Sequence, residues 1–301
     1  MIPAGTPPTA ALTNATLRWS GGELDLSEPR IMGVLNVTPD SFSDGGLFHR
    51  PEDAIAHGLQ MVEQGAEILD VGGESSRPAG AVYGAGAERV SEAEEIGRVV
   101  PVIRALSLES GVPISIDTTK SAVAEAALEA GAVMVNDISG LSMDPRMGAV
   151  CAAAECPVVL MHMRGNPGDT FASAAFDDVV ADVVRELAEA VDRAVAAGIA
   201  RDQLVLDPGL GFGKPQAGNL QMIRDMAAFH TLGLPLLMGP SRKAFIGEAL
   251  GGVGVEGRDW GTAAAVAVCV WAGAHIVRVH DVSPMRDVVR VTRAIARGTF
   301  A

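Results

Sequence analysis

Carboxylate and amide side chains follow several short apolar runs of the chain, and their chemistry indicates recognition of a flat polar ring. Asp117, Asn136 and Asp207 each stand at the end of such a run. Together they supply hydrogen-bond acceptors and an amide, the complement of a heterocycle whose edge presents amino and ring N–H donors beside acceptors. We therefore interpret these three residues as candidates for binding a heterocyclic ligand.

A glycine-rich segment begins at Asp207 and reads Asp-Pro-Gly-Leu-Gly-Phe-Gly-Lys up to Lys214. Its end is similar to a P-loop, but that motif requires Gly where Pro208 stands and Ser or Thr where Pro215 stands. The glycines instead allow the backbone to come close to a flat ligand, against which Phe212 offers a ring face. The pattern favours a ring-binding loop over a nucleotide-binding one.

Cations near the end of the chain indicate a site for an anion. The chain carries 23 Lys and Arg against 37 Asp and Glu, a net charge of -14, which disfavours general binding to nucleic acid or anionic lipid. A bound anion therefore needs a local cluster of cations. Arg278 and His280, with the start of a helix after Ser241, are the predicted cluster, because the loops after the last two strands of a barrel often hold phosphate.

Two other loops combine polar side chains with flexible residues. Residues 36–46 include Phe42 among Pro, Asp and Gly residues, which suits a mobile lid, and residues 72–78 bring two hydroxyl groups and Arg77 to reach over a phosphate. An ordinary solvated loop is the alternative for both.

His162 has no second His or Cys at metal-binding spacing, so we interpret it as structural. No Ser-His-Asp constellation or zinc motif is apparent, which disfavours hydrolysis by either route.

The elements that must position these residues alternate between short apolar runs and longer helical patterns. This alternation is typical of βα units and a parallel sheet. The predicted strands are residues 31–37, 68–71, 114–116, 133–135, 158–161, 204–206, 234–238 and 276–279. The predicted helices are residues 52–64, 91–108, 121–129, 145–154, 177–197, 220–229, 258–272 and 283–296.

The number of strand and helix pairs predicts an α/β fold, a single-domain (β/α)8 TIM barrel. We expect the barrel over residues 30–301, preceded by a leader with a short hairpin around Ser20, Gly21 and Gly22 in residues 1–29. A doubly wound open sheet is the architectural alternative. In a barrel the ends of all strands lie on one face, so the polar residues above would gather in one pocket.

Composition agrees with a globular protein, since 48% of the residues are hydrophobic and 20% are charged. Residues 1–19 have neither the basic nor the apolar segment of a secretory signal, so we expect a cytoplasmic protein. The longest uncharged run, residues 261–277, ends directly at Arg278 and falls short of a membrane span. Cys151, Cys156 and Cys269 match no metal or disulfide pattern and are expected to be buried thiols.

Taken together, these motifs resemble dihydropteroate synthase, with similarity from about residue 30 to the C-terminus. The resemblance implies a TIM barrel, a homodimer and a sulfonamide target. It implies a transferase of folate biosynthesis that joins p-aminobenzoate to 6-hydroxymethyl-7,8-dihydropterin pyrophosphate, giving 7,8-dihydropteroate and pyrophosphate, with Mg²⁺ as cofactor. The blocks that carry the resemblance are residues 31–46, 71–78, 115–118, 135–140, 206–214, 241–243 and 278–281.

The resemblance also implies roles for individual residues. Asn36 would ligate Mg²⁺ bound to the pyrophosphate, and Asp40 and Asp44 would lie near the reacting carbon. Asp40, Asp44, Arg77 and Lys243 are the expected catalytic residues. The pterin would be held by Asp117, Asn136, Asp207, Lys243 and Met161, the phosphates by Arg77, Arg278 and His280, and the aminobenzoate by Phe42, Pro78, Phe212 and Lys243, with Ser76 among the substrate-binding residues.

Two other functions remain open from the sequence. One is a pterin-dependent methyltransferase domain, although a methyl donor has no pyrophosphate for Arg278 and His280 to bind. The other is a non-catalytic pterin-binding paralogue. Ala244 stands where many members of the family place Ser, so we expect a changed affinity for aminobenzoate.

Overall fold

Eight parallel strands form the centre of the fold. The computed structural model describes residues 15–38, 50–74, 90–165 and 175–300. The strand order is β8-β7-β6-β5-β4-β3-β10-β9, and a parallel bridge between Leu206 and Leu236 joins the two ends, so the sheet closes into a barrel. The strands are β3 (Arg30–Asn36), β4 (Ile68–Gly72), β5 (Ile114–Asp117), β6 (Met134–Asp137), β7 (Val158–Met161), β8 (Leu204–Asp207), β9 (Leu237–Met238) and β10 (Ile276–Val279).

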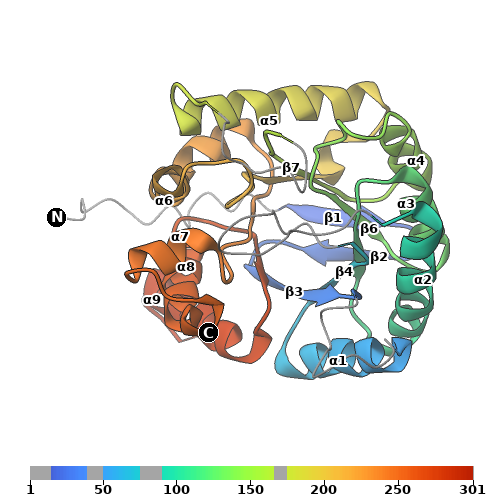
Figure 1. Ribbon diagram of the computed structural model, residues 1–301, viewed down its shortest axis with the longest axis horizontal. Helices are drawn as coiled ribbons and strands as arrows, with labels where there is room; N and C mark the ends of the chain where they lie inside the picture. Colours follow the sequence, from blue (N-terminus) through green and yellow to red (C-terminus); the bar gives the residue numbers. More distant parts are fainter. Residues whose placement is uncertain (1–14, 39–49, 75–89, 166–174, 301) are drawn as a thin grey trace.

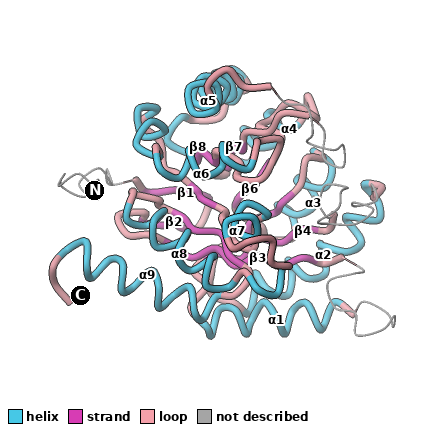
Figure 2. The backbone as a smooth tube through the Cα atoms, turned by 60° about the vertical axis from the view of Figure 1, so that its left-hand side comes forward, coloured by secondary structure: helices cyan, strands magenta, loops and turns pink. Residues whose placement is uncertain are grey.

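The helices form a ring around these strands (Figure 1). The tube view shows the same ring from another side, with α1 and α9 running below the strands (Figure 2). Both views agree with the predicted TIM barrel and exclude the open sheet. The helices are α1 (Pro51–Gln64), α2 (Glu92–Glu109), α3 (Ser121–Glu129), α4 (Met147–Ala154), α5 (Val179–Ala196), α6 (Gln216–Arg224), α7 (Ala244–Ala249), α8 (Asp259–Trp271) and α9 (Val282–Arg297).

Alternation along each strand divides the apolar residues into two cores. Successive side chains of a strand point to opposite faces, so neighbours such as Ile31 and Met32 belong to different clusters. The outer cluster packs the strands against the helices. The inner cluster lies at the amino ends of the strands, inside the barrel, and consists of Met32, Ile68, Met134, Val159, Val205, Leu237 and Ile276 together with three leucines of the N-terminal segment.

Those leucines belong to the expected hairpin, which has strands β1 (Thr16–Trp19) and β2 (Gly22–Asp25). Gly21 takes a positive φ of 94° in its turn, a conformation that glycine adopts without steric cost. Leu17, Leu24 and Leu26 are buried against the inner cluster. The hairpin therefore closes the barrel at the amino ends of its strands.

The structure corrects one predicted helix. The expected helix at 220–229 begins earlier, at Gln216, and ends at Arg224, after which residues Met226–Leu232 form a 3₁₀ helix. The earlier start follows from Asn219, whose side chain donates to Pro215 O and accepts from the Gly211 backbone N–H. These bonds tie the first turn of α6 to the glycine-rich loop. The helix expected to start after Ser241 is the short α7, which ends at Ala249.

No helix within the described ranges is long and apolar enough to cross a membrane. The three cysteines are free and buried, as expected.

The hairpin predicts a measurable contribution to stability. Leu17 has 0% of its surface exposed, so Leu17→Ala should lower the free energy of unfolding by about 2–5 kcal/mol, because it leaves a cavity in the inner cluster. Leu108→Ala is the matched control, since Leu108 on α2 is 82% exposed, and it should change stability by less than about 0.5 kcal/mol. Urea unfolding followed by circular dichroism measures both. Equal stability of the two variants would contradict a packed role for the hairpin.

Candidate active site

The candidate site is the next inward-facing layer of the same barrel. Asp70, Asn136, Asp207 and Arg278 each follow a residue of the inner cluster by two positions, so they point into the barrel one layer nearer to the carboxyl ends of the strands. Met161 follows Val159 of the inner cluster in the same way, and Asp117 is inward because it alternates with Ile114 and Ile116 of β5, which belong to the outer cluster. Strand geometry therefore brings together side chains that are widely separated along the chain.

Arg278 lies between two acids at the centre of this layer. Its Nε donates to Asp70 Oδ2 at 2.6 Å, and its Nη2 donates to Asp117 Oδ2 at 2.7 Å. Asn136 Nδ2 donates to the same Asp70 oxygen at 2.9 Å. The expected anion-binding arginine is therefore paired with two carboxylates, one of which, Asp117, is an expected ligand-binding residue.

Burial dominates the electrostatics of the carboxylates. It raises the pKa of Asp117 from 3.8 to about 7, although the positive charge of Arg278 acts in the opposite direction; the nearby Asp70 adds to the increase. Burial also raises the pKa of Asp207, while the backbone N–H of Gly209, 2.7 Å from Asp207 Oδ1, and the charge of Lys243 oppose it. Ligand groups that donate hydrogen bonds would favour the ionised form of both acids.

Lys243 follows β9 and lies against the ring of Phe212. Its Nζ is 4.1 Å from the ring centroid, a cation–π contact. Gly211, with a φ of 82°, allows this approach, because an added Cβ would lie 3.0 Å from Lys243 Cδ. The pair was predicted to shape one binding slot, and the structure places the two side chains together.

The residues expected at the anion site also lie together. His280, after β10, donates its backbone N–H to Ser241 Oγ at 3.3 Å, and its Nδ1 lies 3.0 Å from the same oxygen. Arg242, with a positive φ of 59°, donates from Nη2 to Asp281 Oδ2 at 2.7 Å. The backbone after β9 is thus fixed beside the end of β10.

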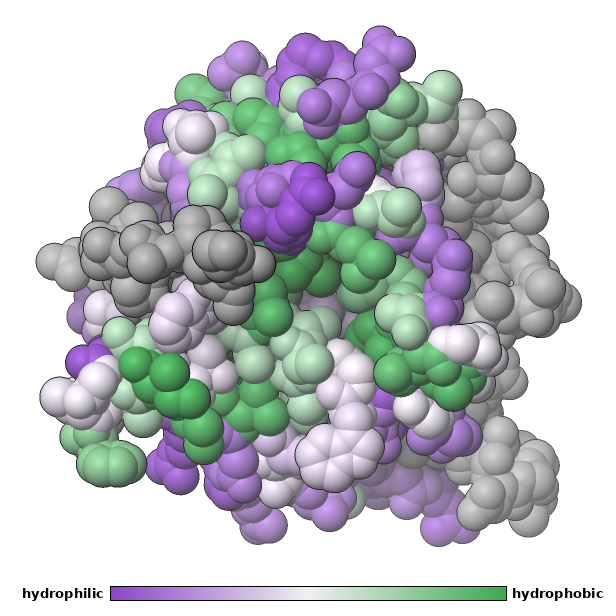
Figure 3. Space-filling view, turned by 90° about the vertical axis from the view of Figure 1, so that its left-hand side faces the viewer, coloured by the Kyte–Doolittle hydropathy of each residue, from purple (hydrophilic) through white to green (hydrophobic). Residues whose placement is uncertain are grey.

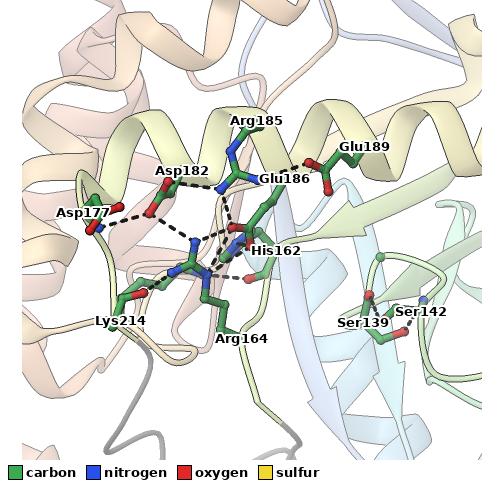
Figure 4. A network of polar contacts seen from close by, with 12 residues as sticks. Ser139, Ser142, His162, Arg164, Asp177, Asp182, Arg185, Glu186, Glu189 and Lys214 are labelled. Carbon is green, nitrogen blue, oxygen red and sulfur yellow. Dashed lines mark hydrogen bonds and ion pairs between the residues drawn. The ribbon is translucent and has the colours of Figure 1, made fainter.

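A network under the glycine-rich loop holds its position (Figure 4). Lys214 Nζ donates to the backbone oxygen of His162 at 2.7 Å, and His162 Nε2 lies 2.9 Å from Glu186 Oε2 on α5. Arg164 forms ion pairs with Glu186 and Asp182. A Cβ at Gly209 would overlap the His162 carbonyl, so this glycine permits close packing of the loop on the end of β7.

Burial determines the charge of His162. It lowers the pKa of His162 to about 4, with Lys214 contributing in the same direction and Glu186 opposing. His162 is therefore neutral at pH 7, which supports the structural interpretation made from the sequence. The pKa of Glu186 falls to about 2 despite its partial burial, since Arg164 and His162 bond to the carboxylate.

A second ionic cluster, not anticipated from the sequence, lies beside Asp117. Lys120 Nζ donates to Glu95 Oε2 and to the backbone oxygen of Val90, each at 2.6 Å, and it pairs with Glu74 at the end of β4. Burial raises the pKa of Glu95, although Lys120 opposes that change. The cluster forms only because the end of β4, α2 and the start of α3 lie close together in the fold, so no local sequence motif predicts it.

Two further predicted site residues, Met161 and Asn36, lie at the ends of barrel strands. Met161 is buried at the end of β7, and Asn36 is half-buried at the end of β3, beside Gly72 of β4. Within the described parts of the chain no group of three or more His, Cys, Asp or Glu side chains could hold a metal ion. Asp40, Phe42, Asp44, Ser76, Arg77 and Pro78 lie outside the described residues.

Comparison with known proteins agrees with this arrangement. The family model described as "Pterin binding enzyme" matches residues 32–280. The fold and this match define a pterin-binding barrel enzyme.

Individual proteins with high sequence identity to this chain indicate one family within this class of enzymes. The dihydropteroate synthase of Escherichia coli K12 is 47% identical over 91% of this chain and 94% of its own length, and that of Synechocystis is 45% identical over 89% and 90%. A solved Xanthomonas albilineans dihydropteroate synthase with 4-aminobenzoic acid has a TM-score of 0.86 and 44% identity, covering 94% of this chain and 98% of that one. The chain therefore belongs to the dihydropteroate synthase family, transferases of folate synthesis, which confirms the resemblance, the barrel and the enzyme class inferred from the sequence.

The environment of Lys243 leads to a prediction about its titration. Burial, with Arg278 contributing, lowers the pKa of Lys243 from its ordinary 10.5 to about 8, while Asp207 and Asp117 oppose the change. After reductive methylation with ¹³C-formaldehyde, we expect one dimethyl-lysine NMR signal to titrate near pH 8, and this signal should be missing in Lys243→Ala. If all lysine signals titrate near pH 10, the described burial of Lys243 is wrong.

Proposed function

We propose that this chain joins p-aminobenzoate to 6-hydroxymethyl-7,8-dihydropterin pyrophosphate and releases 7,8-dihydropteroate and pyrophosphate. The observation that carries the proposal is the convergence of Asp117, Asn136 and Asp207 beside Arg278 in one layer of the barrel. A pterin ring carries an amino group and ring N–H groups that match these acceptors. Two solved structures of the X. albilineans enzyme contain 4-aminobenzoic acid and 7,8-dihydropteroate, respectively, which supports this substrate and this product here.

The pterin would lie over Met161 with its donors on Asp117, Asn136 and Asp207, and Lys243 above it. Once ring N–H groups bind Asp117, the guanidinium of Arg278 loses part of its pairing with that acid. Its Nη groups can then bind the pyrophosphate, together with His280, as charge-assisted hydrogen bonds. In this way ring binding and phosphate binding support each other through one arginine.

Asn36 fits the proposed Mg²⁺ site. Mg²⁺ prefers oxygen ligands and is commonly bound by one or two protein groups together with substrate phosphates, so a single amide oxygen at the end of β3 suffices when pyrophosphate supplies the rest. When bound, the ion would neutralise charge on the leaving pyrophosphate.

The reaction then needs no nucleophile from the protein. The bond between the pterin methylene carbon and the pyrophosphate oxygen breaks, and the neutral aniline nitrogen forms the new C–N bond. The proton lost from that nitrogen leaves with the pyrophosphate. Buried carboxylates around the ring stabilise the positive charge that develops on the pterin and its methylene carbon.

Asp40, Asp44 and Arg77 retain the catalytic roles proposed from the resemblance. Phe42, Ser76, Pro78 and Phe212 retain their roles in substrate binding.

The direct test is the release of pyrophosphate by the purified chain with Mg²⁺ and the dihydropterin pyrophosphate, with and without p-aminobenzoate. We expect release that depends on aminobenzoate and yields 7,8-dihydropteroate. Pterin binding without any release would favour the non-catalytic paralogue. Transfer of a methyl group from a methylated folate would favour the methyltransferase. Arg278 and His280, two residues apart at the end of β10, favour the synthase over that second alternative, because a methyl donor carries no pyrophosphate.

His280 provides a prediction specific to the phosphate contact. His280→Ala should raise KM for the pyrophosphate substrate about tenfold, because it removes a charge-assisted contact with phosphate. The affinity for free 6-hydroxymethylpterin, which carries no phosphate, should stay unchanged. Steady-state kinetics and calorimetry measure the two quantities, and equal losses for both ligands would reject the role.

The same proposal places the enzyme in the cytoplasm, where free thiols such as the three buried cysteines stay reduced.

The proposal also includes a homodimer. Apolar side chains gather on the face shown in Figure 3, where α8 and α9 lie side by side. Exposed apolar patches of this kind mark interfaces. The large exposed apolar residues of α8 and α9 are Trp260, Val268, Trp271, Val291 and Ile295, and Leu250 follows α7.

Trp260 on α8 is 88% exposed. We expect Trp260→Glu to convert the dimer into a monomer in light scattering after size-exclusion chromatography, because it places a charge in the interface. Leu108→Glu, on α2 across the barrel, is the control and should leave the dimer intact. A wild-type protein that elutes as a monomer would contradict the proposed dimer.

A further inference from the structure

One buried acid of the site has no role in the proposed mechanism. Asp70 points into the barrel from β4, two positions after Ile68, and its side chain is fully buried. Its Oδ2 accepts hydrogen bonds from two other strands, from Arg278 Nε at 2.6 Å and from Asn136 Nδ2 at 2.9 Å. Asp70 therefore joins two groups of the ligand site through a single oxygen atom.

The contact with Asn136 determines which way the amide of that residue faces. A guanidinium group can only donate hydrogen bonds, so the Asp70 oxygen that Arg278 contacts, Oδ2, acts as an acceptor. The group of Asn136 that faces Asp70 must therefore be its NH₂, so the amide oxygen is directed elsewhere. Without Asp70 the two orientations of the amide would be close in energy, since the two ends have nearly the same shape.

The second oxygen of Asp70 supports a role beyond packing. Among the residues that the structure describes, Oδ1 has no hydrogen-bond partner. A buried acceptor without a donor is unfavourable for folding, so an acid selected only for stability would be expected to satisfy both oxygens. The carboxylate instead accepts hydrogen bonds from Arg278 and Asn136, two residues of the proposed ligand site.

We propose that Asp70 is a positioning residue for pterin recognition, which presents the Asn136 amide oxygen to an N–H group of the ring by binding the amide nitrogen. The proposal rests on the function proposed above for this pocket. With Asp117 and Asp207, the amide oxygen becomes a third acceptor around the ligand. The pocket then selects a ring edge rich in donors, and it discriminates against an edge with a carbonyl oxygen in place of the amino group.

Calorimetric titration with two ligands tests the proposal. The ligands are 6-hydroxymethylpterin and lumazine, a pteridine with a carbonyl oxygen in place of the 2-amino group. We expect Asp70→Leu to reduce the preference for the pterin over lumazine about tenfold, because the freed amide can turn its NH₂ toward the carbonyl. Asp70→Asn should keep the preference, because its amide oxygen can occupy the position of Oδ2 and accept from Asn136.

A double-mutant cycle locates the effect. If Asp70 acts through Asn136, adding Asp70→Leu to Asn136→Ala should change the preference by less than about twofold. An unchanged preference in Asp70→Leu alone, or a full additional loss in the double variant, overturns the proposal. Asp137→Asn is the matched control, since this buried acid of β6 bonds to the backbone N–H groups of Ser139 and Leu141. It should lose stability and keep the preference.

Asp70→Ser is the second variant if Asp70→Leu does not fold. A hydroxyl group can both donate and accept hydrogen bonds, so it no longer selects one orientation of the Asn136 amide, and the preference should fall as in Asp70→Leu. A serine variant that keeps the wild-type preference overturns the proposal. A wild-type chain that binds neither ligand contradicts the proposed function, which separates that failure from a failure of this inference.

Discussion

A guanidinium group held between two buried carboxylates governs the chemistry of the barrel opening. Removing charges from water costs several kcal/mol per ion, and only close pairing compensates for it. Arg278 pairs with both Asp70 and Asp117, so none of the three can be changed without leaving a buried charge without its present partner. The site is therefore a coupled unit, in which a ligand that binds one acid changes the environment of the arginine.

Burial moves two pKa values of the site toward neutral pH. Burial brings the pKa of Asp117 up to about 7 and the pKa of Lys243 down to about 8. Small changes in hydrogen bonding therefore shift the charge of either group at neutral pH. Groups held in this way respond strongly to ring donors and to the negative charge of a pyrophosphate.

Much of the fold and part of the site follow from the sequence, because both depend on the period of two along a strand. The polar residues after each apolar run mark inward positions of the barrel, and Asp117, Asn136 and Asp207 lie together as expected. The helix beginning at Gln216 was misplaced because its start depends on Asn219 bonding to the glycine-rich loop, a tertiary contact. The role of Asp70 was missed because its partner Arg278 lies 208 residues away, and only the closure of the barrel brings the two together.

The hairpin at the amino ends of the strands also limits the routes into the barrel. Its leucines and the inner cluster fill the barrel axis, so the described core leaves no passage through the barrel. Substrates must then enter, and products must leave, through the same opening at the carboxyl ends of the strands.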